Sequence, residues 1–556
     1  MYPEYMMESI KKVEKTRPHR LEIVKKYGKQ VFPAMSEKER DEILNKYHPD
    51  YKTEARREVR VGPNKGEKLT TKVADMLESH SRIDPKMFDL EKVDHETDVM
   101  VIGAGSAGMA SAITAANNGS DVLIVTKLRL GDSNSMMAQG GIQAADQDDD
   151  SPSIHYLDVI GGGHFDNKPK LVEALVKDGP KSIQWLENLG VMFDKNPNGS
   201  MSVKPGGGTS RSRMHSTRDY TGAGICRVLR DEVYNKPDKI KYIEYTAIVE
   251  LILNKKGHAV GAVAYHLDTK QYSIVKAKSI IIATGGFGRL HVGGFETTNH
   301  YGATADGLML AYRAGANLLY MDSVQYHPTG AVFPEQIVGF LCTEKIRTLG
   351  AQPLNKNGEL FVYPLEPRDI EASSFIRETI NGMGIETPSG LKGIWLDSPL
   401  IEKIEGDGTI EKTLPAMLRQ FSRFDIDIRK YPMLVYPTLH YQNGGIEINQ
   451  KAETKIKGLY VAGEASGGVH GRNRLMGNSQ LDIIVFGRRA GLNASKRAKG
   501  KVAFGKFSLE HVNKYEKEVS KLKIDKNKIA PVILPDYIPD HVKKRQMTSE
   551  FYGTLS

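Results

Sequence analysis

Residues 98–126 read DVMVIGAGSAGMASAITAANNGSDVLIVT, and this stretch decides the fold. The apolar runs at its two ends have the length and composition of buried strands, and the Ala-rich segment between them favours a helix. Gly103, Gly105 and Gly108 stand between the first strand and the helix in the spacing G-x-G-x-x-G. In this context the glycines let the backbone approach a pyrophosphate, which the helix N-terminus then faces. The stretch therefore predicts a parallel α/β sheet of the Rossmann type that binds a dinucleotide.

Three further loops indicate which dinucleotide is bound. NAD-binding units carry an acidic residue about 20 residues after the glycines, but here the second strand ends in Thr126 and Lys127. The small and polar loop 133–141 (SNSMMAQGG) follows that strand, ATGG at 283–286 follows another, and Gly463-Glu464 follows a third. Loops at the ends of several strands of one sheet suit an extended cofactor, so the sequence favours FAD over NAD.

The order of patterns predicts a cofactor domain that an inserted domain interrupts. The runs 242–253, 259–267 and 279–286 predict an antiparallel excursion that returns to a buried strand, and 459–463 (LYVAG) resumes the first pattern. The expected fold is an α/β Rossmann-type FAD-binding domain with a parallel sheet, an inserted α+β capping domain, an N-terminal extension and a short helical C-terminal segment. The expected boundaries are 1–95 for the extension, 96–326 and 438–500 for the FAD-binding domain, 327–437 for the capping domain and 501–556 for the tail.

Short helical patterns separated by loops are expected in the extension. Among them, 35–47 (MSEKERDEILNKY) offers Ser36 and Glu39 as a capping box. The tail is Lys-rich and helical at first and then punctuated by prolines, as expected of a segment that lies across a surface.

Composition excludes several classes of protein. The chain has 556 residues, 40% of them hydrophobic and 26% charged, which is typical of globular domains and excludes disorder. Its two cysteines, Cys226 and Cys342, cannot build an iron–sulfur or zinc cluster, so we expect no metal site and expect an organic cofactor to carry the electrons. No run approaches the ~18 to 20 apolar residues that span a bilayer, and the start lacks a signal-peptide pattern. We therefore expect a cytoplasmic protein.

The net charge of +9 comes from the two ends of the chain. Residues 1–90 hold 20 Lys and Arg against 16 Asp and Glu, and residues 496–556 hold 14 against 7. Neither end has zinc-finger spacing or an aromatic and basic sheet motif, so a nucleic-acid partner is not expected. Solvated faces or docking on an acidic partner subunit explain the charge better.

Eleven motifs now make the prediction specific. They are GAGSAG, TK, SNSMMAQGG, ATGG, TADG, QYHPTG, CTEKIR, PRD, LHYQNGG, AGEASGG and HGRNRLMGNSQLD, in this order between about residues 97 and 500. In kind and order they resemble the flavoproteins of the succinate dehydrogenase/fumarate reductase family. The resemblance implies that FAD is lined by Gly103, Gly105, Ser106, Ala107, Gly108, Thr126, Lys127, Ser133, Asn134, Ser135, Ala138, Gln139, Gly140, Gly141, Ala283, Thr284, Gly285, Asp306, Glu464, Ser479 and Gln480.

The sequence departs from the family pattern at Asn134. Respiratory members of the family attach the flavin through a histidine at this place, and an amide cannot form that bond. The sequence therefore predicts non-covalent FAD. An untethered flavin is expected to have a lower potential, which favours reduction of fumarate over oxidation of succinate.

The resemblance also implies a dicarboxylate site. His440 and Arg474 would hold one carboxylate from the FAD-binding domain, while His327 and Thr343 would hold the other from the capping domain. Two buried carboxylates need such cations and donors, because an unpaired buried charge is very costly. By the same analogy Arg368 is the proton donor and base, and Glu344 and Arg347 relay its proton to and from solvent.

Alternative functions remain open at this stage. L-aspartate oxidase shares most of the motifs, but it places a carboxylate where this chain has Gly206 ahead of Gly207 and Gly208. A relative acting on another unsaturated acid, or on an oxyanion as adenylylsulfate reductases do, is a second alternative, and a non-catalytic flavin electron-transfer subunit is a third. By resemblance, an iron–sulfur subunit is the expected partner, contacted through the N-terminal extension or the basic tail, with quinol, thiols or another flavoprotein as the ultimate donor. Such partner subunits would also explain any attachment at the inner face of the membrane.

Overall fold

The dinucleotide-binding unit forms where residues 98–126 predict it. The computed structural model describes residues 2–29 and 32–535. Strand β4 (His95–Ile102) leads through the glycine turn into α4 (Ser106–Asn117), and β5 (Val122–Val125) lies parallel to β4. The carboxyl ends of β4 and β5 therefore meet at one edge of the sheet, next to the N-terminus of α4.

The main sheet extends this unit in both directions. On one side of it, β8 (Ile240–Ile243) pairs parallel to β5. On the other, β11 (Tyr272–Ile282) pairs parallel to β4, and β19 (Leu459–Val461) pairs parallel to β11. The predicted antiparallel excursion is confirmed, because β9 (Thr246–Asn254), β10 (Ala259–His266) and β11 pair antiparallel in sequence.

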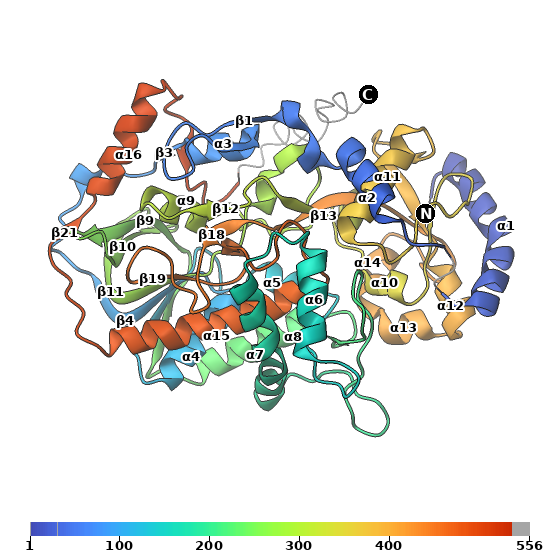
Figure 1. Ribbon diagram of the computed structural model, residues 1–556, viewed down its shortest axis with the longest axis horizontal. Coiled ribbons are helices and arrows are strands. Elements are labelled where there is room, and N and C mark those ends of the chain that lie inside the picture. The colour runs from blue at the N-terminus through green and yellow to red at the C-terminus, as the bar shows by residue number, and fades with distance from the viewer. Residues whose placement is uncertain (1, 30–31, 536–556) are drawn as a thin grey trace.

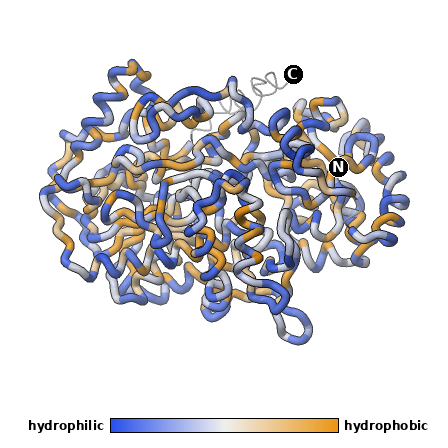
Figure 2. The backbone as a smooth tube through the Cα atoms, in the orientation of Figure 1, coloured by the Kyte–Doolittle hydropathy of each residue, from blue (hydrophilic) through white to orange (hydrophobic). Residues whose placement is uncertain are grey.

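Apolar side chains drive these strands into the interior. All nine residues of β9 are buried, and the long helix α15 (Asn478–Ala498) packs across α4 and β11. The hydrophobic parts of the chain gather around the sheet while hydrophilic segments mark the periphery, as Figure 2 shows. The other helices of this part are α5 (Asn134–Met137), α6 (Pro152–Gly162), α7 (Pro169–Asn188), α8 (Thr221–Tyr234) and α9 (Asp306–Arg313).

A second lobe grows from two long strands. β13 (Val324–Phe333) and β17 (Met433–Gln442) pair antiparallel and carry the chain into and out of this lobe. An antiparallel sheet and a set of helices complete it (Figure 1). They are β14 (Pro353–Leu354), β15 (Ile385–Glu386), β16 (Lys392–Leu396), α10 (Lys345–Thr348), α11 (Arg368–Ile380), α12 (Pro399–Glu405), α13 (Thr409–Thr413) and α14 (Pro415–Ser422). The expected domain limits at 327 and 438 fall inside β13 and β17.

The N-terminal extension begins with a longer helix than expected. Helix α1 (Glu4–Tyr27) has 24 residues, and Met6, Ile10 and Val13 are buried along one side of it. Their spacing forms a stripe that packs on α12 of the second lobe, so tertiary contact extends the helix beyond the short patterns seen in the sequence.

The extension then crosses from the second lobe to the FAD-binding lobe. Helix α2 (Glu37–Tyr47) packs on α11, and its predicted capping box between Ser36 and Glu39 is confirmed. Farther along, Asn64 exchanges hydrogen bonds with the backbone of Leu318 at 2.8 and 3.1 Å. Figure 1 shows the extension running from α1 and α2 to α3 (Thr71–Leu77) and β3 (His80–Ser81) over the main sheet. The described residues contain no helix long and apolar enough to cross a membrane.

One buried carboxylate anchors α1. Asp397 is fully buried and accepts hydrogen bonds from Arg17 and Arg20, each at 2.8 Å. We expect Asp397→Asn to lower the free energy of unfolding by about 3 to 5 kcal/mol, because removing one partner of a buried pair leaves uncompensated charge. Chemical denaturation measures this change. The exposed pair of Lys38 and Glu42 supplies a control, Glu42→Gln, which should leave stability unchanged. Equal stability of the two variants would contradict the anchoring role.

Candidate active site

A cavity of about 460 Å³ lies at the carboxyl ends of β4, β5 and β11. Most of the cofactor residues expected from the sequence line it. They are Gly103, Gly105, Ala107, Thr126, Lys127, Ser133, Asn134, Ser135, Ala138, Gln139, Ala283, Thr284, Gly285, Asp306, Glu464, Ser479 and Gln480. Segments far apart in the chain therefore form one continuous site.

The glycine turn makes room that other residues would fill. Gly103 has a φ of +101°, and a Cβ there would lie 2.5 Å from the carbonyl oxygen of Ala283. Gly105 stands at the N-terminus of α4 with its backbone facing the cavity. This backbone cradle suits a pyrophosphate.

Four of the expected cofactor residues shape the backbone and do not line the cavity. The Ser106 hydroxyl is buried 3.0 Å from the Cys226 sulfur. A Cβ at Gly108 would lie 2.0 Å from the Gly103 carbonyl oxygen, so this glycine allows α4 to pack on its strand. Gly140 lies against Met476, and Gly141 has a φ of +139° beside the backbone of His215.

Polar side chains in the cavity wall lack partners that a ligand would supply. Within the described chain, Gln139 Oε1 and Gln480 Oε1 are buried without a hydrogen-bond partner. The carboxylate of Glu464 accepts from the Gln442 backbone at 3.0 Å, and burial raises its pKa to about 7. Such acceptors fit a cofactor that carries hydroxyl and N–H donors, as the ribityl chain and ring of FAD do.

Asn134 is held by its neighbours. Its amide donates to Asn299 Oδ1 at 2.5 Å and to Glu464 Oε2 at 3.4 Å, while its carbonyl oxygen accepts from the His300 backbone at 2.5 Å. The side chain therefore sits in a polar network next to the cavity.

His327 and His440 lie side by side on the two strands that connect the lobes. Their ring centroids are 4.9 Å apart. The Thr329 backbone N–H donates to His327 Nδ1 at 3.2 Å, which leaves Nε2 as the protonated donor. Burial, followed by the nearby arginines, lowers the pKa of both histidines well below 6.5. Both rings are therefore neutral donors, and the positive charge beside them resides on arginine.

Two arginines meet at one glutamine. Arg368 Nη1 and Arg474 Nη2 donate to the same oxygen, Gln325 Oε1, at 3.0 and 2.9 Å. Burial, followed by the charge of Arg368, lowers the pKa of Arg474 to about 9. Gln325 begins the QYHPTG motif but is not among the site residues predicted from the sequence, because nothing in the sequence indicates that it bridges two cations.

A chain of buried ion pairs leads away from Arg368. Its Nε donates to Glu344 Oε2 at 2.8 Å, and Arg347 Nη2 lies 3.5 Å from the same oxygen. Arg347 also forms a close ion pair with Glu371, another residue that the sequence did not indicate. Thr343, which is 1% exposed, directly precedes Glu344 in the loop that leads into α10.

Opposing charges and burial set the ionisation of the residues in these ion pairs. Burial lowers the pKa of Arg368, although Glu344 acts in the other direction. For Glu344, burial opposes ionisation, yet Arg368 and Arg347 hold its pKa below the ordinary value. Burial also raises the pKa of Glu371 well above its ordinary value. The ionised Glu344 thus lies between the guanidinium groups of Arg368 and Arg347, and the carboxyl group of Glu371 lies beyond Arg347.

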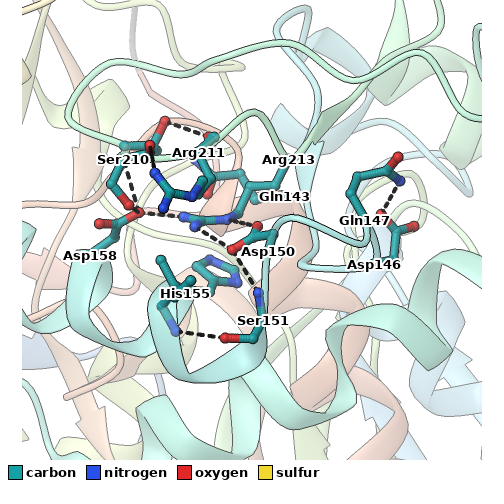
Figure 3. A network of polar contacts seen from close by, with 12 residues as sticks. Gln143, Asp146, Gln147, Asp150, Ser151, His155, Asp158, Ser210, Arg211 and Arg213 are labelled. Carbon is teal, nitrogen blue, oxygen red and sulfur yellow. Dashed lines mark hydrogen bonds and ion pairs between the residues drawn. The ribbon is translucent and has the colours of Figure 1, made fainter.

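A glycine loop from the FAD-binding lobe provides a further hydrogen bond to Glu344. The Gly207 backbone N–H donates to Glu344 Oε1 at 2.9 Å. Figure 3 shows how this loop is held: Arg213, at its far end, pairs with Asp150 at 2.6 Å and with Asp158, which also accepts from Ser210. The network thereby fixes Gly207 opposite Glu344.

The same region supports the start of α15. His155 Nε2 lies 3.0 Å from Asn478 Oδ1 (Figure 3 shows His155 beside the Arg213 network). Asn478 opens α15 directly ahead of the cavity residues Ser479 and Gln480. Among the described residues, no group of three or more His, Cys, Asp or Glu side chains could hold a metal ion.

Comparisons with known proteins agree with this site. The sequence profile described as FAD binding domain matches residues 98–480. The chain is 37% identical over 419 residues to one of the subunits of fumarate reductase (CoM/CoB) from Methanothermobacter marburgensis, covering 74% of each chain. It is 34% identical to the L-aspartate oxidase of a Nostoc species, covering 72% of this chain and 69% of that one. A structure of Escherichia coli quinol fumarate reductase FrdA with a point mutation superposes with a TM-score of 0.68 at 30% identity, covering 77% and 74%.

Fold, cavity and profile together define an FAD-dependent oxidoreductase with a Rossmann-type cofactor domain. The chain belongs to the succinate dehydrogenase/fumarate reductase flavoprotein family, whose members act on CH–CH bonds. FAD is its cofactor, as the cavity-lining residues and the profile both indicate.

Glu464 makes the stability of the FAD-free protein depend on pH. Between the ordinary pKa of 4.5 and about 7, the folded protein binds a proton on Glu464 that the unfolded chain releases. The free energy of unfolding should therefore fall as pH rises through this window, by roughly 3 kcal/mol at 1.36 kcal/mol per pKa unit. Denaturation of the FAD-stripped protein at several pH values should show this fall relative to Glu464→Gln. The exposed Glu411 provides a control, Glu411→Gln, which should retain the wild-type pH dependence.

Proposed function

We propose that the protein reduces fumarate to succinate, and the contact between Arg368 and Glu344 carries this proposal. It places a proton-bearing guanidinium, buried and backed by an ionised carboxylate, beside two histidines and a second arginine. Bound FAD would supply the hydride for one alkene carbon from its N5 atom. The chain's own residues then have to hold a dianion and deliver one proton to the other carbon.

Recognition of a dicarboxylate follows from the donors that converge on the site. His440 and Arg474 would hold one carboxylate, and His327 and Thr343 the other. Arg474 Nε is buried without a partner in the described chain, and His327 Nε2 is available as a donor, as argued above. Two neutral imidazoles and two guanidinium groups supply the charge and hydrogen bonds that a buried dianion requires.

Proton delivery would use the chain of ion pairs. A guanidinium is an unusual acid, since its ordinary pKa is about 12.5 to 13.8. Burial lowers the pKa of Arg368, and a carbanion forming next to it is a strong base. The deprotonated Arg368 would then regain a proton through Glu344, across their 2.8 Å contact, as Glu344 takes one from Arg347, and Arg347 would be reprotonated from solvent. In the direction of succinate oxidation, the same arginine would be the base.

We further propose that FAD is bound without a covalent link. Asn134 occupies the place of the tethering histidine, and its three hydrogen bonds account for both polar atoms of its side chain. A denaturing gel should show flavin fluorescence at the dye front and none on the 61.7 kDa chain. Fluorescence that migrates with the polypeptide would contradict the proposal.

L-aspartate oxidase is disfavoured by the glycine loop. An ammonium substrate needs a carboxylate, but residues 206–208 are all glycine. A Cβ at Gly206 would lie 2.9 Å from Met214 Cε, and one at Gly207 would lie 2.4 Å from Glu344 Oε1, so a side chain at either position would displace a neighbour. Glu344 itself is already paired with two arginines.

An iron–sulfur electron-transfer subunit is the partner that we propose. The described part of the N-terminal extension is docked on its own chain through α1 and α2. In the tail, α16 (Glu510–Lys521) buries Val512, Tyr515 and Val519 while its lysines face solvent. The exposed, lysine-rich stretch 521–528 at the end of α16 thus suits an acidic partner better than the extension does.

Substitution of Arg368 tests the proposed chemistry. We expect Arg368→Lys and Arg368→Gln to retain FAD and to lose at least about 100-fold in fumarate reduction by a reduced viologen dye, since a positioned general acid contributes that much or more. Arg377 lies on the same helix and donates to the Phe361 backbone, so Arg377→Lys is the matched control and should remain active. Near wild-type turnover by the Arg368 variants would exclude this residue as the donor. Turnover of L-aspartate but not fumarate by the wild-type protein would overturn the proposed substrate.

A further inference from the structure

The C-terminal segment reaches the wall of the FAD cavity. We call residues 507–535 the C-terminal strap; it contains β21 (Phe507–Ser508), α16 and β22 (Ile529–Ala530). The Ile533 carbonyl oxygen accepts from Lys127 Nζ at 2.5 Å and from Thr304 Oγ1 at 3.1 Å. Lys127 lines the cavity, so the strap bonds directly to a residue of the cofactor site.

The ammonium group of Lys127 is fully used by these contacts. It donates to Thr304 Oγ1 at 2.6 Å, to Asp306 Oδ2 at 2.7 Å and to Ile533. A lysine has three N–H donors, so none is left over for FAD. Lys127 therefore lines the cavity, as the sequence predicts, and also fixes Asp306 and the strap in place.

The strap is attached to both ends of helix α9. At its start, Lys127 donates both to Asp306 and to the Ile533 carbonyl oxygen, and Thr304 donates to the same carbonyl. At its end, Arg313 Nη1 donates to the Ala530 carbonyl oxygen at 2.9 Å, and Arg313 Nε pairs with the fully buried Glu250 at 2.8 Å. Helix α9 carries Asp306 into the cavity wall, so the position of this wall depends on the strap.

The strap is also fastened to the end of the N-terminal extension. Strand β22 pairs parallel to β3, and Glu516 of α16 lies 2.8 Å from His80 Nδ1. Arg82 Nε donates to the Pro531 carbonyl oxygen at 3.0 Å. Figure 1 shows α16 beside β3 on the side of the sheet where α9 lies. These contacts hold the strap independently of the cavity.

Backbone conformation marks the contact with the cavity as a specific one. Ile533 has a φ of +68° and Ala305, beside Thr304, has a φ of +66°. Positive φ values are unfavourable for residues with a Cβ, above all for a β-branched one. They persist only where the surrounding structure enforces them, and they gather at ligand clamps.

We propose that the C-terminal strap belongs to the FAD-binding apparatus: by fixing Lys127, Thr304 and Asp306, it closes the cavity wall and retains the cofactor. Because FAD has no tether to the chain in our proposal, retention depends on such non-covalent contacts. FAD binding and strap docking are then coupled, and the coupling acts equally in both directions.

Two truncations test this role in the FAD-loaded protein. Deletion of residues 529–556 removes the contacts of Ala530 and Ile533, whereas deletion of residues 536–556 keeps them. The longer deletion should release FAD about 5- to 150-fold faster, which is the usual range of coupling between two sites. The shorter deletion should release it at the wild-type rate. The recovery of flavin fluorescence after dilution measures the release. Equal release rates for the two truncations would overturn the proposal.

A point variant keeps the test valid if the longer truncation does not fold. Arg82→Met loosens the strap without touching the cavity or α9, and it should also release FAD faster. Its control is Arg429→Met, which removes a comparable surface arginine that pairs with Asp427 in the other lobe and should have no effect. An unchanged release rate for Arg82→Met, with thermal unfolding like that of wild type, would count against the strap.

Limited proteolysis tests the reverse direction of the coupling. Lys526 and Lys528 are exposed just before β22. FAD should slow tryptic cleavage at these residues relative to the FAD-stripped protein, while cleavage at the distant Lys412 should be unaffected. If the denaturing gel shows covalent flavin, the proposal of untethered FAD fails, and comparing the flavin-bearing protein with protein produced without flavin still decides whether the strap senses the cofactor. Equal cleavage with and without FAD would overturn the coupling.

Discussion

The site depends on one interaction, the 2.8 Å contact between the buried Arg368 guanidinium and the Glu344 carboxylate. A buried cation without a partner would be very unstable, and a cation with several partners would never give up its proton. Arg368 shares the Glu344 carboxylate with Arg347. It shares the neutral Gln325 oxygen with Arg474. The arrangement keeps Arg368 charged and desolvated, which is what its proposed role as proton donor requires.

Both ends of the chain serve the two lobes that build this site. The N-terminal extension is anchored on the second lobe, where its Arg17 pairs with Asp397, and on the FAD-binding lobe, where its Asn64 bonds to Leu318. Arg40 of α2 pairs with Glu366, two residues ahead of Arg368, and so steadies the start of α11. The C-terminal strap acts in the same way on the other side, where it holds α9 against the cofactor cavity. Segments outside the dinucleotide-binding unit thus complete its wall.

The two histidines proposed to bind substrate lie close together because two strands pass between the lobes. His327 on β13 pairs with Thr438 on β17, which brings its ring within 4.9 Å of the ring of His440, 113 positions away in sequence. The same two strands join the FAD-binding lobe to the lobe that supplies Arg368 and Glu344. A relative movement of the lobes would therefore directly alter the distance between Arg368 and the cofactor cavity.

The sequence by itself determined the dinucleotide-binding unit, the antiparallel excursion and the motifs that indicate FAD and a dicarboxylate site, because strand periodicity, glycine spacing and helix capping are local properties. It could not show that Gln325 joins two arginines, that Glu371 pairs with Arg347, or that Gly207 donates to Glu344. Nor could it show that Lys127 uses its donors on Asp306 and the C-terminal strap. Those roles arise from contacts between residues up to 406 positions apart, and only the packing of the folded chain decides which buried charges and donors find one another.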